Sequence, residues 1–125
     1  MGPLLNCPSM DLDLESTRRG TASVLTLRGE IDVYTAPRLR QAIVDLVNGG
    51  ATRVVVDMEK VDFLDSTGLG VLVEGLKRAR SKESDLAIVA TQDKILKIFD
   101  ITGLNKAFII HRTLDEAVGE SPAES

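Results

Sequence analysis

Two short apolar runs most constrain the fold of this chain, RVVVDM at residues 53–58 and DLAIVA at residues 85–90. Both are too short for a helix and lack the polar alternation of a strand that faces water on one side. Runs of this kind are typical of buried strands in a sheet that is covered on both faces. Each run is followed along the chain by a segment with helical spacing of apolar residues, which predicts an α/β domain.

The segments ahead of the first run predict an antiparallel hairpin. MDLDLES at residues 10–16 and SVLTLRG at residues 23–29 alternate apolar and polar side chains. This period of two is the pattern of half-buried strands, and RRGT at residues 18–21 reads as the turn between them. The second strand is expected to end at Gly29.

Amphipathic segments and their caps predict the helices. A run of apolar residues at helical spacing, with a cap before it and glycine after it, is the usual mark of a helix. The first expected helix spans 37–47, with Thr35 or Ala36 as its N-cap, and the second spans Leu69–Ala79. The third is capped by Thr91 and ended by Gly103, and its inward residues are Ile95, Ile98 and Phe99. A short last helix is opened by TLDE at 113–116. AFIIH at 107–111 is the expected last strand. The order β-β-α-β-α-β-α-β-α predicts a mixed sheet with right-handed crossovers.

The length and composition fit one domain that works in a reducing compartment. The 125 residues are enough for a single core, expected here over residues 10–118, with 1–9 as a flexible leader or a remnant of cloning and 119–125 as a disordered tail. Cys7 is the only cysteine, which excludes an intrachain disulfide and suits the cytoplasm. No apolar run is long enough to cross a membrane. The net charge of −4 argues against nucleic acid as a partner.

The segment LDSTGLG at residues 64–70 is the candidate site, because it puts weak helix formers where a helix should begin. Asp65, Ser66 and Thr67 are each good N-cap residues, so capping explains the acid and the hydroxyls. Gly68 and Gly70 each cost about 1 kcal/mol relative to alanine inside a helix, and capping does not explain them. Two missing side chains would leave bare backbone for another protein to approach. From the residues alone, a plain cap and a docking or modification site remain equal alternatives.

Enzymatic readings of the same segment find little support in the sequence. A serine nucleophile needs a base, but His111 is the only histidine, it follows a distant strand, and the local pattern is not G-x-S-x-G. The glycines match neither the dinucleotide-binding nor the P-loop spacing. Asp32 and Asp65 could serve an enzyme, yet no His–carboxylate set indicates a metal. We therefore expect no enzyme, no metal and no cofactor.

Three motifs in order resemble the anti-sigma factor antagonists of the STAS family: GEIDVYTAP at 29–37, DFLDSTGLGVLV at 62–73 and ILKIFDITGL at 95–104. The similarity runs from about Met10 to Val118 and implies a single STAS-like domain. It also implies that Ser66, the first hydroxyl after the aspartate, is the phosphoacceptor. Asp32 matches the acid that lies near the acceptor in the family. Thr67 stands at a position where the family permits either hydroxyl.

The resemblance further implies a phosphorylation switch with two partners. The unphosphorylated form would bind a serine kinase that is also the anti-sigma factor and so free a sigma factor; phosphorylation would end binding, and a serine phosphatase would reverse it. The implied partner surface comprises Asp32, Asp65, Ser66, Thr67, Gly68 and Leu69. A monomer is expected. The alternative is a STAS-type scaffold or signalling module in a larger stress-sensing complex. We expect the start of the helix to accept the added charge within the fold.

Overall fold

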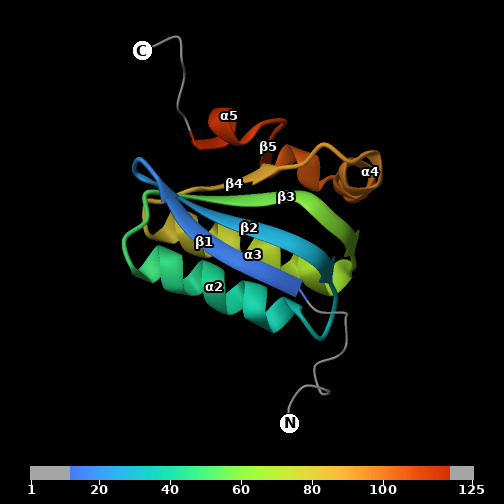
Figure 1. Ribbon diagram of the computed structural model, residues 1–125, viewed down its shortest axis with the longest axis horizontal. Helices are drawn as coiled ribbons and strands as arrows, with labels where there is room; N and C mark the ends of the chain where they lie inside the picture. Colours follow the sequence, from blue (N-terminus) through green and yellow to red (C-terminus); the bar gives the residue numbers. More distant parts are fainter. Residues whose placement is uncertain (1–11, 119–125) are drawn as a thin grey trace.

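Five strands form one mixed sheet in the computed structural model, which describes residues 12–118 (Figure 1). The strands are β1 Leu12–Arg19, β2 Ala22–Ile31, β3 Arg53–Leu64, β4 Leu86–Val89 and β5 Ile109–His111, and they lie in the order β1-β2-β3-β4-β5. β1 and β2 are antiparallel, and every later pair is parallel. The predicted α/β fold with an N-terminal hairpin is therefore confirmed. The expectations for residues 1–9 and 119–125 lie outside the described residues.

Helices cover both faces of this sheet. They are α2 Ala36–Asn48, α3 Ser66–Ser81, α4 Asp93–Thr102 and α5 Leu114–Val118, with a 3₁₀ turn, η1, at Leu104–Lys106. α2 and α3 lie side by side on one face, and α5 lies on the other (Figure 1). The crossover from β3 to β4 thus places α3 beneath the strands that precede and follow it.

Neighbouring residues of the central strands face two separate apolar clusters. The larger cluster fills the space between the sheet and the pair α2 and α3, and it includes Leu25 and Val56. The smaller one includes Val24 and Val55 and packs against Ala117 of α5. Because both faces are buried, the strands read as continuous apolar runs rather than as alternating ones. The prediction of buried strands at residues 53–58 and 85–90 is confirmed.

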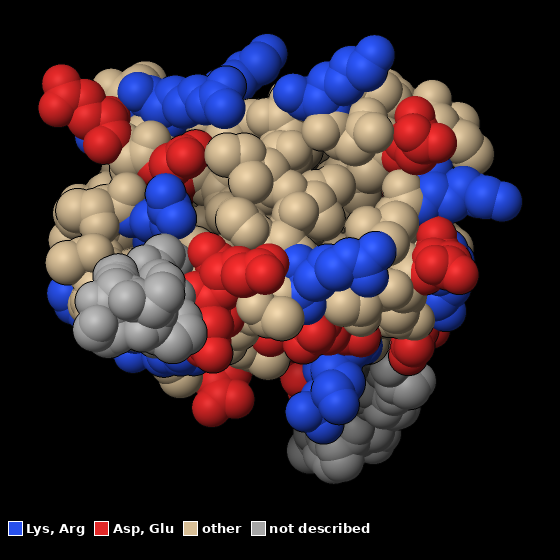
Figure 2. All heavy atoms as spheres, turned by 90° about the horizontal axis from the view of Figure 1, so that it is seen from above, with Lys and Arg blue, Asp and Glu red and all other residues tan. Residues whose placement is uncertain are grey.

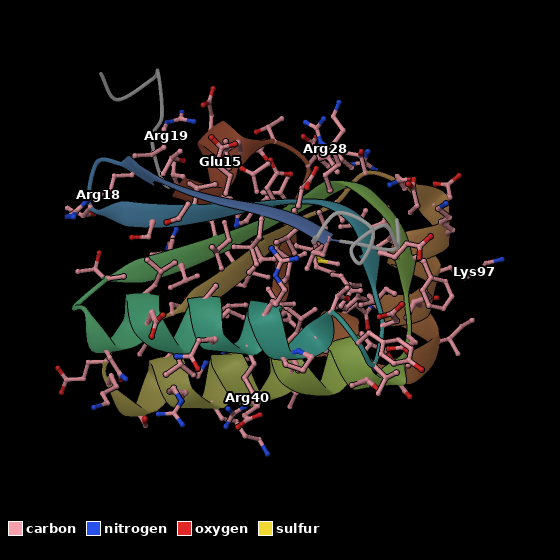
Figure 3. The ribbon with its side chains drawn as sticks, turned by 60° about the horizontal axis from the view of Figure 1, so that its bottom comes forward. Glu15, Arg18, Arg19, Arg28, Arg40 and Lys97 are labelled. Atoms are coloured by element: carbon pink, nitrogen blue, oxygen red, sulfur yellow. The ribbon has the colours of Figure 1, made fainter. Side chains whose placement is uncertain are left out.

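A bidentate ion pair joins the two helices of the larger face. Arg40 on α2 donates from Nε to Oε1 of Glu74 on α3 at 3.1 Å and from Nη2 to Oε2 at 2.9 Å; Figure 3 shows Arg40 on the surface at the two helices. The hydrogen bond with Arg40 lowers the pKa of the Glu74 carboxyl, and the same bond raises the pKa of Arg40. Both side chains are half exposed, so this pair is a surface contact.

The hairpin differs from the prediction at both ends of β2. Arg19 pairs with Ala22, so the turn consists only of Gly20 and Thr21 and not of residues 18–21. β2 also continues through Gly29, where the strand was expected to end. Gly29 has a φ of 117°, a conformation that glycine adopts without strain, and it lies at a register shift between β2 and β3. The strand therefore bends at this glycine instead of stopping.

β3 is twice as long as its apolar run, and two bulges interrupt the pattern of its second half. Thr26 pairs with Asp57 while Arg28 pairs with Lys60, so β3 carries one residue more than β2 in this interval. A second extra residue follows between Gly29 and Glu30. Bulges bend a strand and change which face its side chains point to. The two strands nevertheless end together, with Ile31 opposite Leu64.

Gln92 fastens the start of α4 to the bulged part of β3. Its side-chain amide donates to the carbonyl of Glu59 at 3.1 Å and to that of Val61 at 2.6 Å. Gln92 is also the N-cap residue of α4, so the prediction that Thr91 caps this helix is wrong by one position. At the other end, Gly103 stops α4 with a left-handed φ of 77°, as predicted. Ile95 and Phe99 are buried, whereas Ile98 is only half-buried.

Candidate functional site

The two aspartates singled out in the sequence lie next to each other at one edge of the sheet. Asp32 directly follows β2 and Asp65 directly follows β3, and the last paired residues of those strands are Ile31 and Leu64. The backbone N–H of Asp65 donates to the carbonyl of Ile31 at 3.1 Å, which extends the ladder by one step. Since α2 and α3 begin just beyond these residues, two helix starts and two carboxylates share this edge (Figure 1).

Asp32 organises the loop between β2 and α2. Its Oδ1 accepts hydrogen bonds from the backbone N–H groups of Tyr34, at 2.9 Å, and Thr35, at 3.0 Å. The buried hydroxyl of Thr35 donates to the carbonyl of Glu30 at 2.8 Å and accepts from the N–H of Asp32 at 2.9 Å. Thr35 occupies the predicted N-cap position of α2, but its hydroxyl bonds back to the strand end rather than to the helix. The loop is consequently held at both of its ends.

Asp65 is the residue that caps α3. Its Oδ1 accepts from the N–H of Thr67 at 2.9 Å and from the N–H of Gly68 at 3.1 Å. Ser66 and Thr67 are then the first two residues of the helix, and both are exposed. Of the three cap candidates the structure selects the acid. The Ser66 hydroxyl is therefore not the group that caps α3.

The two glycines of this segment have different causes. A Cβ on Gly68 would lie 2.5 Å from Cγ2 of Ile31 and 2.7 Å from Cδ1 of Leu64, so Gly68 is buried and lets α3 pack closely on the strand ends. The expectation that Gly68 leaves bare backbone at the surface is therefore wrong. Leu69 is buried too. Gly70 is exposed, and nothing lies within 4 Å of the position its Cβ would take.

Three backbone N–H groups at the start of α3 already have hydrogen-bond acceptors. The N–H groups of Thr67 and Gly68 already bind the Asp65 carboxylate, and the N–H of Leu69 binds the carbonyl of Asp65. A phosphate on Ser66 would thus stand beside an existing carboxylate and would have to compete for these amides. The expectation that the helix start accepts the phosphate within the fold stays a prediction.

Exposed apolar side chains flank this edge, and the sequence pattern does not single them out. Val33 is 56% exposed and Tyr34 is 83% exposed, both in the loop that Asp32 organises. Phe63, next to the end of β3, is 49% exposed. Tyr34 is the only tyrosine of the chain, but nothing in the sequence pattern shows that its side chain points to solvent.

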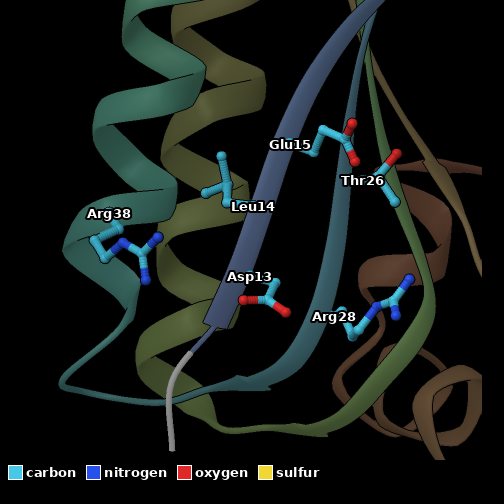
Figure 4. A pocket seen from close by; sticks show the side chains of 6 residues that line it. All are labelled: Asp13, Leu14, Glu15, Thr26, Arg28 and Arg38. Carbon is cyan, nitrogen blue, oxygen red and sulfur yellow. The ribbon is translucent and has the colours of Figure 1, made fainter. Parts of the chain in front are cut away.

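Other surfaces offer no comparable chemistry among the described residues. The pocket in Figure 4 lies at the start of β1 and mixes acids with bases, with Asp13 opposite Arg28 across the hairpin. On the face that carries α4 and α5, basic and acidic side chains are interspersed around an uncharged centre (Figure 2). Within residues 12–118 there is no cluster of three or more metal-ligating side chains. Nor does that part of the chain contain a helix long and apolar enough to cross a membrane.

Comparisons of the sequence and the fold with known proteins give consistent matches. The family model described as the STAS domain matches residues 13–117. The anti-sigma-B factor antagonist of Staphylococcus aureus (strain NCTC 8325 / PS 47) is 36% identical over 95 residues, which are 76% of this chain and 88% of that protein. The protein of the same name from Listeria monocytogenes is 34% identical over 114 residues, or 90% and 99% of the two chains. An anti-sigma factor antagonist from Mycobacterium paratuberculosis has a similar crystal structure, with a TM-score of 0.80 and 34% identity over 86% of this chain and 91% of that one.

Proposed function

Because this chain belongs to the STAS domain family, we propose that it is an anti-sigma factor antagonist whose binding is switched by phosphorylation of Ser66. In the unphosphorylated form it binds a serine kinase that doubles as an anti-sigma factor, and a sigma factor is released. Phosphorylation ends this binding, and a serine phosphatase restores it. The observation that carries the proposal is the exposed Ser66 hydroxyl at the first position of α3, where Asp65 supplies the cap.

The modification is a phosphoryl transfer in which this chain is the substrate. The Ser66 oxygen forms a bond to the γ-phosphorus of ATP, the bond from that phosphorus to the bridging oxygen of ADP breaks, and the hydroxyl proton passes to a base of the kinase. The product carries about 1.5 to 2 additional negative charges and three acceptor oxygens. This chain needs to supply only a reachable hydroxyl, so we propose a binding protein and not an enzyme.

The added charge acts on the partner rather than on the fold. Asp65 already binds the N–H groups of Thr67 and Gly68, so a phosphate on the exposed Ser66 would compete with that carboxylate for these amides and is expected at the surface. Two unit charges about 6 Å apart repel by roughly 1–3 kcal/mol at effective dielectrics between 40 and 20. A repulsion of that size lowers affinity by about tenfold to a hundredfold. An acidic or tightly packed partner surface is therefore expelled without refolding of this chain.

The proposed partner surface is centred on the edge where β2 and β3 end. Ser66 and Thr67 are exposed there, and Asp32 and Asp65 are half-buried, so all four lie within reach of a partner. Gly68 and Leu69, which the sequence also nominated, are buried. We propose that these two support the surface from below, through the close packing of α3, instead of touching the partner directly.

Phosphorylation by the cognate kinase tests the proposal. The chain is incubated with that kinase and ATP, and its intact mass is expected to rise by one phosphoryl group. Ser66→Ala should remain unmodified, while Thr67→Ala, the matched neighbour, should be modified as wild type. If Ser66→Ala is phosphorylated as readily as wild type, the acceptor is misassigned. Ser66→Asp should weaken kinase binding by about tenfold or more with an unchanged circular dichroism spectrum.

A further inference from the structure

We propose that Val33 and Tyr34, here called the apolar tip, anchor the kinase that acts on Ser66. The inference rests on the proposed function and deepens it by naming the surface that holds the partner. It assigns separate roles in binding to two neighbouring parts of the surface. The apolar tip provides contact area that phosphorylation does not alter, and Ser66 provides the charge that changes.

The exposure of the apolar tip is not required by the fold. Tyr34 is 83% exposed and Val33 is 56% exposed, although the residues on both sides of the loop, Ile31 and Ala36, are buried. The backbone of Tyr34 is fixed by its N–H bond to Asp32, and its ring takes no part in that bond. Tyrosine is among the residues most often found as binding hot spots, because one rigid ring offers a large apolar area together with a polar end.

The loop presents this ring in a fixed position. Oδ1 of Asp32 accepts hydrogen bonds from the N–H groups of Tyr34 and Thr35, one on each side of the Tyr34 Cα, and the Thr35 hydroxyl ties the loop to the end of β2. A contact residue on a backbone that is already ordered loses little conformational freedom on binding. The apolar tip therefore has the properties of a preorganised anchor.

The short distance between the apolar tip and Ser66 indicates that the kinase is the partner that binds the tip. The N–H of Tyr34 is 2.9 Å from Oδ1 of Asp32, and Asp32 and Asp65 follow directly paired residues of adjacent strands. One aspartate side chain, one strand spacing and one residue step then place the Tyr34 backbone within roughly 15 Å of Ser66. A standard interface covers about 800 Å² of each partner, a circle of roughly 16 Å radius. A kinase interface of this size that is centred on Ser66 therefore reaches the apolar tip, and we assign the kinase an apolar pocket that receives Tyr34.

The test compares three variants for binding to the purified cognate kinase in the presence of ADP, so that no transfer occurs. Tyr34→Ala removes the ring, Tyr34→Phe keeps the ring and removes the hydroxyl, and Ile109→Ala is the matched control. Ile109 is 54% exposed and aligns through Ala87 with Val55, nine residues before Leu64 in β3. This places the control roughly 30 Å from the site along the strand direction.

Calorimetry should show a loss of affinity of at least about thirtyfold for Tyr34→Ala, the usual size of a hot-spot truncation. Tyr34→Phe and Ile109→Ala should stay within about threefold of wild type. In the kinase reaction, KM for Tyr34→Ala should rise while Ser66 remains the residue modified. If wild type binds the kinase and Tyr34→Ala binds it with the same affinity, the anchoring role of Tyr34 is refuted while the proposed function stands. If Tyr34→Phe loses as much affinity as Tyr34→Ala, the contact is not apolar. A change confined to self-association in sedimentation would assign the tip to a second copy. A wild-type chain that the kinase neither binds nor phosphorylates overturns the proposed function together with the anchor.

Discussion

Substituting Gly68 and Gly70 with alanine, one at a time, is expected to have opposite effects on stability. Both positions lie near the start of α3, so the gain in helix propensity from glycine to alanine, up to about 1 kcal/mol, applies to both. The surroundings differ. At Gly70 nothing lies within 4 Å of the new Cβ, so Gly70→Ala should be neutral or stabilise the fold by up to about 1 kcal/mol.

At Gly68 the new methyl group has no room. Its contacts of 2.5 Å with Ile31 and 2.7 Å with Leu64 fall about 1 Å short of an ordinary carbon–carbon separation. Ile31 is fully buried and β-branched, so its Cγ2 cannot move aside by a simple rotation, although Leu64 has more freedom. Overpacking of this kind costs about 1–3 kcal/mol. After the propensity gain, Gly68→Ala should lose roughly 0–2 kcal/mol against wild type and about 1–3 kcal/mol against Gly70→Ala.

Urea unfolding followed by circular dichroism measures this difference directly. The comparison between the two variants is the decisive quantity, because the propensity term cancels in it. The slope of the free energy of unfolding against urea should be the same for both variants, which shows that the midpoints report stability. If Gly68→Ala proves as stable as Gly70→Ala, the close packing of α3 on the strand ends is not a constraint, and the steric requirement for glycine at position 68 is refuted.

Two further predictions concern the cap and the surface ion pair. Asp65→Ala should lower the free energy of unfolding by about 1 kcal/mol, because the N–H groups of Thr67 and Gly68 lose their acceptor. Asp65→Asn should keep most of the stability that the cap contributes. Equal urea midpoints for wild type and Asp65→Ala would contradict the cap. The pKa of Glu74 lies below its ordinary value of 4.5, so its pairing with Arg40 stabilises the fold above that pH, and the contribution is lost as the pH falls through the lower folded-state pKa. The urea midpoint of the wild type should fall as the pH drops below about 4.5, and the midpoint of Glu74→Gln should fall less steeply there. An unchanged pH profile of the midpoint would show that the pair contributes nothing to stability.

The sequence predicted the strands where burial on both faces produced continuous apolar runs, and it failed where bulges broke the pattern. Val54, Val55 and Val56 are all buried, so the first half of β3 is visible as a run. In its second half the buried residues are Val61 and Leu64, three apart, because the bulged register no longer alternates. A pattern of period two cannot detect such a strand. The extension of β2 past Gly29 was missed for a related reason, since glycine usually signals the end of a strand.

The sequence pointed to the segment around Ser66 as a candidate site, but which of its residues caps α3 became clear only from the coordinates. Asp65, Ser66 and Thr67 have nearly equal preference for the cap position, so residue type alone could not choose among them. The need for glycine at position 68 comes from side chains of Ile31 and Leu64, one of them far away in the chain. Likewise, a solvent-facing Tyr34 cannot be read from a motif, because exposed and buried tyrosines look the same in sequence.

The way Tyr34 is held has a consequence for the evolution of the proposed switch. It joins the hydrogen bonds of its loop through its backbone N–H, which every residue except proline possesses. A mutation at this position can therefore exchange the side chain while the loop, the cap of α3 and the Ser66 hydroxyl stay as they are. In a cell that holds several related antagonists, each could acquire its own kinase by drift at one exposed residue. Fidelity between parallel signalling circuits would then evolve without any change in the chemistry they share.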